Sequence, residues 1–153
     1  MTGGPLPDVP GTYVLLLRPR RTGETVRIGA LGTIGLEAGR YAYVGSAFGP
    51  GGLRARVGRH LRDGKKPHWH IDHLLPAVRV EEVWLSTFPE KLEERWVEAL
   101  RASPGAEVPL RGFGAGDCGC EGHLVHLPDA PGPDLLGRQP GDHPVRTFQP
   151  GEG

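Results

Sequence analysis

The longest strand-like segment of the chain runs from residue 11 to residue 18 and contains an uninterrupted apolar run. A continuous run of this kind is typical of a central strand that is buried on both faces. Two shorter β-rich segments, 25–28 and 33–36, are separated by a glycine-rich turn and predict a pair of short strands. A further strand is expected over 41–46. The first half of the chain therefore predicts a small antiparallel sheet.

Helical periodicity begins after the glycine-rich loop that follows the strand at 41–46. Leu53, Val57 and Leu61 recur at every fourth position and mark one stripe of a helix. A second helix is expected over 67–75, because proline suits a first helical turn and Ile71, Leu74, Leu75 and Val78 have helical spacing.

The second half of the chain continues with a strand over 80–86. A third helix is expected to open with the capping-box spacing of Thr87–Glu90 and to end near Ala102. The last strand is expected over 123–127. Together these elements predict an α+β fold with a small central antiparallel β-sheet flanked by helices.

The composition limits the size and class of the protein. The chain has 153 residues, of which 37% are hydrophobic, and this is enough for one domain with a modest core. Much of its glycine and proline lies at the two ends. We therefore expect a flexible N-terminus over 1–10, a domain over 11–127 and a Pro/Gly-rich, disordered tail over 128–153. No run of 18 apolar residues and no signal-like segment is present, so we expect a cytoplasmic protein.

The formal net charge is zero, so nucleic-acid binding would need a local basic patch. Such a patch lies between Arg54 and Lys66, where six Lys/Arg residues stand against one acidic residue. A patch of this kind either contacts phosphate or is a solvated helix face. Arg56 and His60 are four residues apart and share a face of the predicted helix. The nearby residues Tyr13, Tyr43 and His60 favour phosphate chemistry, because a merely solvated helix face has no need of them.

The third predicted helix carries several carboxylates. At 100° per residue, Glu93 lies at the border of the apolar stripe, whereas Glu94 faces water. A carboxylate at such a border needs a partner or a metal ion. The alternative to a metal ion is a salt bridge to an arginine.

These residues resemble a known group of enzymes. The segments 11–13 and 43–45, Gly-Thr-Tyr and Tyr-Val-Gly, look like the paired signature of the GIY-YIG nuclease superfamily. Arg56 and His60 stand at the spacing of the superfamily's helix arginine and of the histidine one turn later. Glu93, followed by apolar residues three and four positions later, resembles its single metal-binding glutamate.

The closer resemblance is to an uncharacterised branch found alone or fused to endonuclease-III-type repair enzymes, and it covers about residues 10–128. It rests on segments 39–47 and 68–72, on the glutamate helix, and on a Gly-rich segment with two cysteines and a histidine after residue 112. The chain departs from the superfamily at Thr12 and Val44, which replace isoleucines. It also departs at Ser46, which replaces a lysine of the excision-repair members, and in a longer segment between the two signatures.

The resemblance implies an Mg²⁺-dependent (or Mn²⁺-dependent) endonuclease that hydrolyses a phosphodiester in DNA, with repair as the expected context. Glu93 would hold the metal ion and Arg56 would stabilise the phosphate charge. Tyr13 or Tyr43 would orient and deprotonate the attacking water, but His60 has the more suitable intrinsic basicity, and the sequence leaves this choice open. The expected substrate contacts are Ser46, Arg54, Arg59, His68 and His70.

Two rival functions remain open at this point. The first is a non-catalytic nucleic-acid-binding module on the same fold. The second is a zinc-stabilised interaction domain, in which Cys118, Cys120 and His123 would be ligands of types that zinc prefers. Against zinc, cysteines separated by one residue in a short loop are not the usual zinc knuckle. Trp69 is expected either in the core or stacked on a base.

Overall fold

The computed structural model describes residues 6–62, 66–114 and 122–150. Strand β1 (Gly11–Pro19) is the centre of a five-stranded sheet, because its first seven residues are buried on both faces as the apolar run predicts. The strand order is β6-β4-β1-β5-β7, and all neighbours are antiparallel. The other strands are β4 (Arg40–Ala47), β5 (Val78–Ser86), β6 (Leu124–Leu127) and β7 (Arg146–Phe148). A separate hairpin pairs β2 (Thr25–Ile28) with β3 (Gly32–Gly35).

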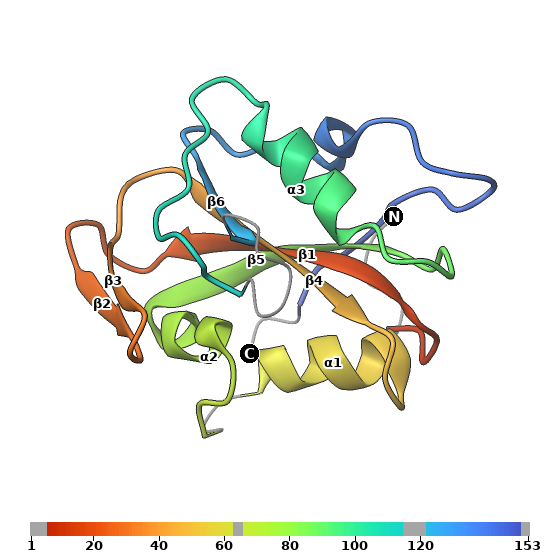
Figure 1. Ribbon diagram of the computed structural model, residues 1–153, viewed down its shortest axis with the longest axis horizontal. Helices are drawn as coiled ribbons and strands as arrows, with labels where there is room; N and C mark the ends of the chain where they lie inside the picture. The colour runs from red at the N-terminus through yellow and green to blue at the C-terminus, as the bar shows by residue number, and fades with distance from the viewer. Residues whose placement is uncertain (1–5, 63–65, 115–121, 151–153) are drawn as a thin grey trace.

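Helices cover both faces of this sheet (Figure 1). On one face lie α1 (Gly52–Leu61), α2 (His70–Leu74) and the short 3₁₀ helix η1 (Leu75–Ala77), packed on a core that includes Leu15. On the other face lie α3 (Glu93–Arg101) and the 3₁₀ helix η2 (Pro133–Leu136), packed on a core that includes Leu16. Leu15 and Leu16 lie on opposite faces because successive side chains of a strand point to opposite sides of the sheet. The predicted α+β class is confirmed.

The second helix is shorter than expected. The prediction placed it from Pro67 to Leu75, but α2 spans only His70–Leu74, η1 follows, and β5 already begins at Val78. Pro76 lies in η1, and proline lacks the N–H that a continuing α-helix would need.

The third helix also begins later than its capping-box pattern indicates. It starts at Glu93, and no side chain of the Thr87–Glu90 segment caps it. Instead, the backbone N–H of Leu92 donates to the hydroxyl of Thr12 at 3.1 Å, 80 positions earlier in the chain. A tertiary contact therefore takes the place of the expected local cap.

Both ends of the chain make defined contacts with the rest of the domain. The carbonyls of Pro7 and Val9 accept hydrogen bonds from the backbone N–H groups of Arg54 and Leu53, at 2.8 and 2.9 Å, so residues 6–10 dock on the start of α1. These carbonyls serve the first turn of the helix, whose N–H groups need acceptors, and the flexibility expected over 1–10 stays a prediction. Residues 1–5 lie outside the described part.

The Pro/Gly-rich tail, for which disorder is expected over 128–153, contains regular elements within residues 128–150. This segment contains η2 and β7, and β7 pairs with β5. Leu136 is only 3% exposed, and the indole N–H of Trp96 donates to Gln139 at 3.2 Å. A few anchoring contacts order a segment whose composition alone suggests disorder. Residues 151–153 lie outside the described part.

None of the helices in the described segments is long and apolar enough to cross a membrane.

Candidate functional site

The two signature tyrosines lie on the same face of the sheet. In the β1–β4 register, Tyr13 pairs with Gly45 and Leu15 pairs with Tyr43, and the two tyrosine rings are 6.5 Å apart between centroids. A Cβ atom on Gly45 would lie 2.5 Å from the Tyr13 hydroxyl oxygen. The ring of Tyr13 therefore crosses directly over the glycine of the second signature. A side chain at position 45 would therefore collide with Tyr13.

His60 is the hydrogen-bond partner of Tyr13. Helix α1 packs Val57 and His60 against the sheet, and His60 is only 3% exposed. The hydroxyl oxygen of Tyr13 lies 2.7 Å from Nε2 of His60. Two residues that were alternative candidates for the base are thus in direct contact.

Both tyrosines are held in the neutral form. Burial raises the pKa of Tyr13 well above its ordinary value of 10, and the neighbouring Tyr43 raises it further. Burial also raises the pKa of Tyr43, with a contribution from the negative charge of Glu93. The positive charge of Arg56 lowers both pKa values but does not offset burial. Neither tyrosine is therefore a standing phenolate near neutral pH, and a proton leaving water needs a further acceptor.

Arg56 lies at the edge of the sheet, where β6 no longer covers β4. The pairing between β4 and β6 ends at Tyr43 and Leu124, and Ser46 lies three residues further along β4. Nη1 of Arg56 donates to the backbone carbonyl of Ser46 at 3.1 Å. A hydrogen bond between Arg56 and the hydroxyl of Tyr13 also lowers the pKa of Tyr13. The guanidinium thus links the open edge of β4 to the tyrosine pair.

A shallow cavity of about 220 Å³ adjoins this arginine. It lies between the end of β4 and α1, and its lining combines small residues with two cations: Ala47, Gly49, Pro50, Gly52, Ala55, Arg56 and Arg59. Small residues leave room for a ligand to approach the backbone, and arginine suits phosphate. The cavity has the chemistry of a phosphate-sized site.

Glu93 comes from the opposite face of the sheet. It is the first residue of α3, and its side chain is 18% exposed, as expected for the border of the apolar stripe. The hydroxyl of Ser46 donates to Oε1 of Glu93, and Nδ1 of His123 lies 3.1 Å from Oε2. Burial raises the pKa of Glu93, but the hydrogen bonds from His123 and Ser46 lower it more, so the net pKa is below its ordinary value. The carboxylate is therefore ionised at neutral pH.

The partners of Glu93 differ from the arginine that the sequence offered as an alternative. Ser46, expected as a substrate contact, instead holds the carboxylate, and His123 holds its other oxygen. No local sequence pattern predicts this role of His123, because it depends on how the start of β6 meets β4. There, the N–H of Val44 donates to the carbonyl of His123 at 2.9 Å. His123 was expected as a zinc ligand; Cys118 and Cys120 lie outside the described residues.

The donor set at Glu93 fits one Mg²⁺ ion better than a multi-ligand metal. Mg²⁺ is often bound through one or two carboxylates and keeps several waters. Glu93 is an ionised and partly exposed carboxylate. Within the described ranges, no group of three His, Cys, Asp or Glu residues is placed to hold a metal ion. Glu93 is the protein ligand that the described part of the site offers.

The remaining predicted arginine contacts are engaged within the protein. Arg54 is exposed, its Nε donates to the carbonyl of Leu6 at 3.1 Å, and it lies 3.9 Å from Asp8. Arg59 forms an ion pair with the buried Asp72 at 2.9 Å. Arg59 still lines the small cavity, so it combines a structural contact with access to that site.

The two predicted histidine contacts differ from each other. His68 is exposed, and its ring lies 4.9 Å from that of Trp69. Nδ1 of His70 accepts a hydrogen bond from the N–H of Gly114 at 2.8 Å. A Cβ atom on Gly114 would lie 3.0 Å from the ring of Tyr43, so His70 fixes a loop that borders the tyrosine. His70 is thus a support for the site, whereas His68 remains accessible.

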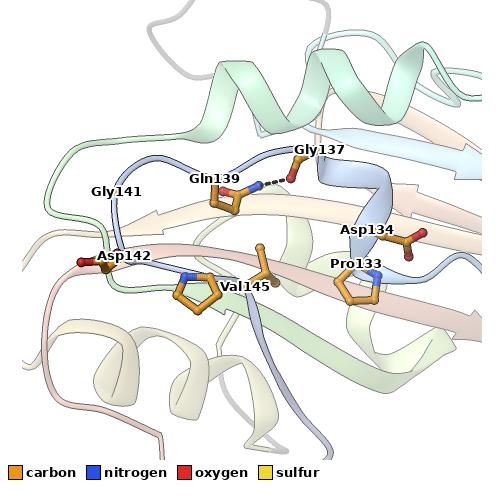
Figure 2. Close-up of a pocket in the computed structure, with 8 residues that line it drawn as sticks. Pro133, Asp134, Gly137, Gln139, Gly141, Asp142 and Val145 are labelled. Carbon is orange, nitrogen blue, oxygen red and sulfur yellow. Dashed lines mark hydrogen bonds between the residues drawn. The ribbon is translucent and has the colours of Figure 1, made fainter.

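A larger cavity lies elsewhere. Its volume is about 490 Å³, and it is formed by the C-terminal segment around η2, as Figure 2 shows. Its lining includes Asp134, Gln139 and Asp142, and none of the predicted site residues contributes to it. We place the candidate site at the edge of β4, because the ionisable groups that could act on a substrate meet there and not in this larger cavity.

The comparison with protein families matches most of the chain. A family model described as "Domain of unknown function DUF123" matches residues 12–136, and the chain belongs to this family. No curated protein and no solved structure matched the chain. The matched span contains the residues from Tyr13 to His123 that form the candidate site, and it reaches through η2, beyond the predicted boundary at residue 127.

Proposed function

We propose that this protein is an endonuclease of the GIY-YIG type that hydrolyses a phosphodiester in DNA with the help of Mg²⁺. One observation carries the proposal. Tyr13, Tyr43, Arg56 and His60 on one face of the sheet meet Glu93 from the other face at the end of β4, beyond its pairing with β6. A solvated basic helix would have no reason to gather these groups.

The residues divide the chemistry among them. Arg56 binds the non-bridging oxygens of the phosphate and stabilises the charge that develops there. Glu93 presents an ionised carboxylate that Ser46 and His123 hold in place. An Mg²⁺ ion bound at Glu93 supplies charge neutralisation at the phosphate and at the leaving oxygen.

The contact between Tyr13 and His60 suggests how the attacking water loses its proton. Because the pKa of Tyr13 is raised by burial, its phenol acts as a relay and not as a phenolate. The phenol accepts the proton of the water as its own proton moves to Nε2 of His60, 2.7 Å away. The tyrosine and histidine that competed for the role of base then act in sequence.

The test is cleavage of a panel of DNA and RNA structures, single-stranded, double-stranded and branched, with and without Mg²⁺. We expect Mg²⁺-dependent cleavage of DNA, and a loss of about 100-fold or more in Glu93→Gln and in Arg56→Ala. Glu94→Gln is the matched control, because Glu94 is the next residue on α3 and is exposed. The control should cleave like the wild-type protein.

Three other outcomes would change the conclusion. Equal cleavage by the wild-type protein and both site variants would remove the assigned site. Binding of nucleic acid without cleavage would favour the non-catalytic binding module. Cleavage of RNA alone would correct the substrate class while leaving the site intact.

A further inference from the structure

Trp69 is surrounded by the basic residues of α1. The guanidinium carbon of Arg56 lies 4.4 Å from the centre of the indole ring, and that of Arg59 lies 4.3 Å from it. Cations within about 6 Å of a tryptophan ring are attracted by its electron-rich face. The ring of His60 is also near, at 5.9 Å between centroids and in an edge arrangement. Three polar residues of α1 thus meet one aromatic ring.

The ring itself is fixed by Asp72. One carboxylate oxygen of Asp72 accepts hydrogen bonds from the backbone N–H groups of His68 and Trp69, at 2.8 and 2.9 Å. The other oxygen accepts from Nη1 of Arg59 at 2.9 Å. The side chain of Asp72 is only 1% exposed. A buried carboxylate with three hydrogen bonds holds the start of α2 against α1, and with it the position of the indole.

Arg56 needs such a support. Its Nη1 bond to the Ser46 carbonyl fixes one nitrogen at the edge of the sheet, and a long side chain with few anchors has several rotamers to lose on binding a phosphate. The indole face covers the guanidinium without using its N–H donors. The N–H donors that do not bond to Ser46 or Tyr13 therefore stay available to a phosphate.

We propose that Trp69 is a positioning residue that holds the guanidinium of Arg56 in place for a phosphate. The effect on catalysis rests on the proposed nuclease function, whereas the orientation of Arg56 does not. This assigns a role to the His-Trp-His-Ile-Asp segment at 68–72: Asp72 fixes the tryptophan, and the tryptophan fixes the arginine. It also distinguishes Trp69 from Trp84 and Trp96, which are fully buried in the core on the other face of the sheet.

A matched pair of variants separates positioning from packing. Trp69→Leu keeps apolar cover but removes the aromatic face, and Trp69→Phe keeps a smaller aromatic face. The first readout is the NMR signal of the Arg56 Nε–H group, identified by its loss in Arg56→Lys. A ring above the guanidinium shifts this signal upfield. We expect the upfield shift to be lost in Trp69→Leu and largely retained in Trp69→Phe, while the signal of Arg95, on α3 across the sheet, stays unchanged. An Arg56 signal that is unaffected in Trp69→Leu would overturn the proposal.

The second readout is steady-state cleavage of the DNA that the wild-type protein cuts best. A displaced catalytic arginine should lower kcat about 10-fold or more, with a smaller change in KM, and Trp69→Phe should recover most of the loss. A rise in KM with unchanged kcat would show instead that Trp69 contacts the substrate, and would overturn the positioning role. If the wild-type protein cleaves nothing, the nuclease function fails, and the NMR experiment still decides whether Trp69 orients Arg56.

Discussion

The two faces of the sheet bury different sets of polar side chains. On the face covered by α1 and α2, the interior includes the ionisable residues His60 and Asp72 together with the two signature tyrosines. On the face covered by α3, the interior is packed around Trp84 and Trp96, and its buried polar side chains include Thr12 and His123 beside the start of α3. The same strands supply both faces, so the difference comes from alternate residues of β1, β4 and β5 and from the helices that cover them.

This difference shows how stability and chemistry are divided. On the α3 face large apolar side chains form most of the core, and Glu93 reaches the site from the first turn of α3. The α1/α2 face accepts buried polar groups, which are costly unless they are hydrogen-bonded, and both Asp72 and His60 have partners. A site assembled at the sheet edge can use groups from both faces without exposing either core.

The largest effect is expected from truncation on the α3 face. Trp96 is fully buried, and its indole N–H also bonds to Gln139. Trp96→Ala should lower the free energy of unfolding by about 3–5 kcal/mol, because it leaves a large cavity. Glu94→Ala on the same helix is the control and should change it by less than about 0.5 kcal/mol. Urea denaturation measures both, and similar values for the two variants would contradict the division between the faces.

A smaller effect is expected where β1 crosses β4 on the face with the tyrosines. Gly45→Ala would place a methyl group 2.5 Å from the Tyr13 hydroxyl, so the ring must move away from His60. We expect a loss of about 1–3 kcal/mol in the free energy of unfolding, together with a large loss of cleavage. Gly35→Ala is the matched control, because Gly35 is also in a strand but a Cβ there meets nothing within 4 Å. Equal stability of the two variants would show that Tyr13 does not lie across Gly45.

The third effect is a pH dependence on the α1/α2 face. Burial raises the pKa of Asp72, but hydrogen bonds from Arg59 and from the backbone of Trp69 and His68 lower it more, to about 2 from its ordinary value of 3.8. Because the folded-state pKa is below the unfolded one, the carboxylate stabilises the protein above about pH 4 and loses this contribution as the pH falls toward 2. The contribution is about 2 kcal/mol at neutral pH.

Asp72→Asn provides the comparison for this prediction. Its free energy of unfolding, measured by denaturation between pH 2 and pH 6, should lack the part of the pH dependence that Asp72 supplies. If the wild-type protein and the variant lose stability in parallel over this range, Asp72 is not the group responsible, and the anchor for Trp69 is weaker than its hydrogen bonds indicate.

Much of the site was predictable from local pattern. The strand at Tyr13, the spacing of Arg56 and His60 on one helix face, and the border position of Glu93 each depend on a short periodicity, and the structure agrees with all three. The capping box at Thr87 failed because Thr12, from another strand, satisfies the helix start. A pattern read within a few residues cannot anticipate a partner 80 positions away.

The tail shows the same limit. Pro- and Gly-rich composition predicts disorder because such a chain buries little apolar surface. Here Leu136 and the β7–β5 pairing are enough to fold residues 128–150 onto a core that already exists. The chain belongs to a family whose matched span ends at residue 136, so η2 is part of the shared domain.

The sequence by itself determined the α+β class, the order of the main strands and helices, and the residue types at the site, because these follow from periodicity and chemical character within short segments. Only the tertiary structure decided that Tyr13 bonds to His60, that Ser46 and His123 hold Glu93, and that Trp69 lies against Arg56. These contacts join residues from different elements. Their distances depend on strand register and helix packing, which no local pattern specifies.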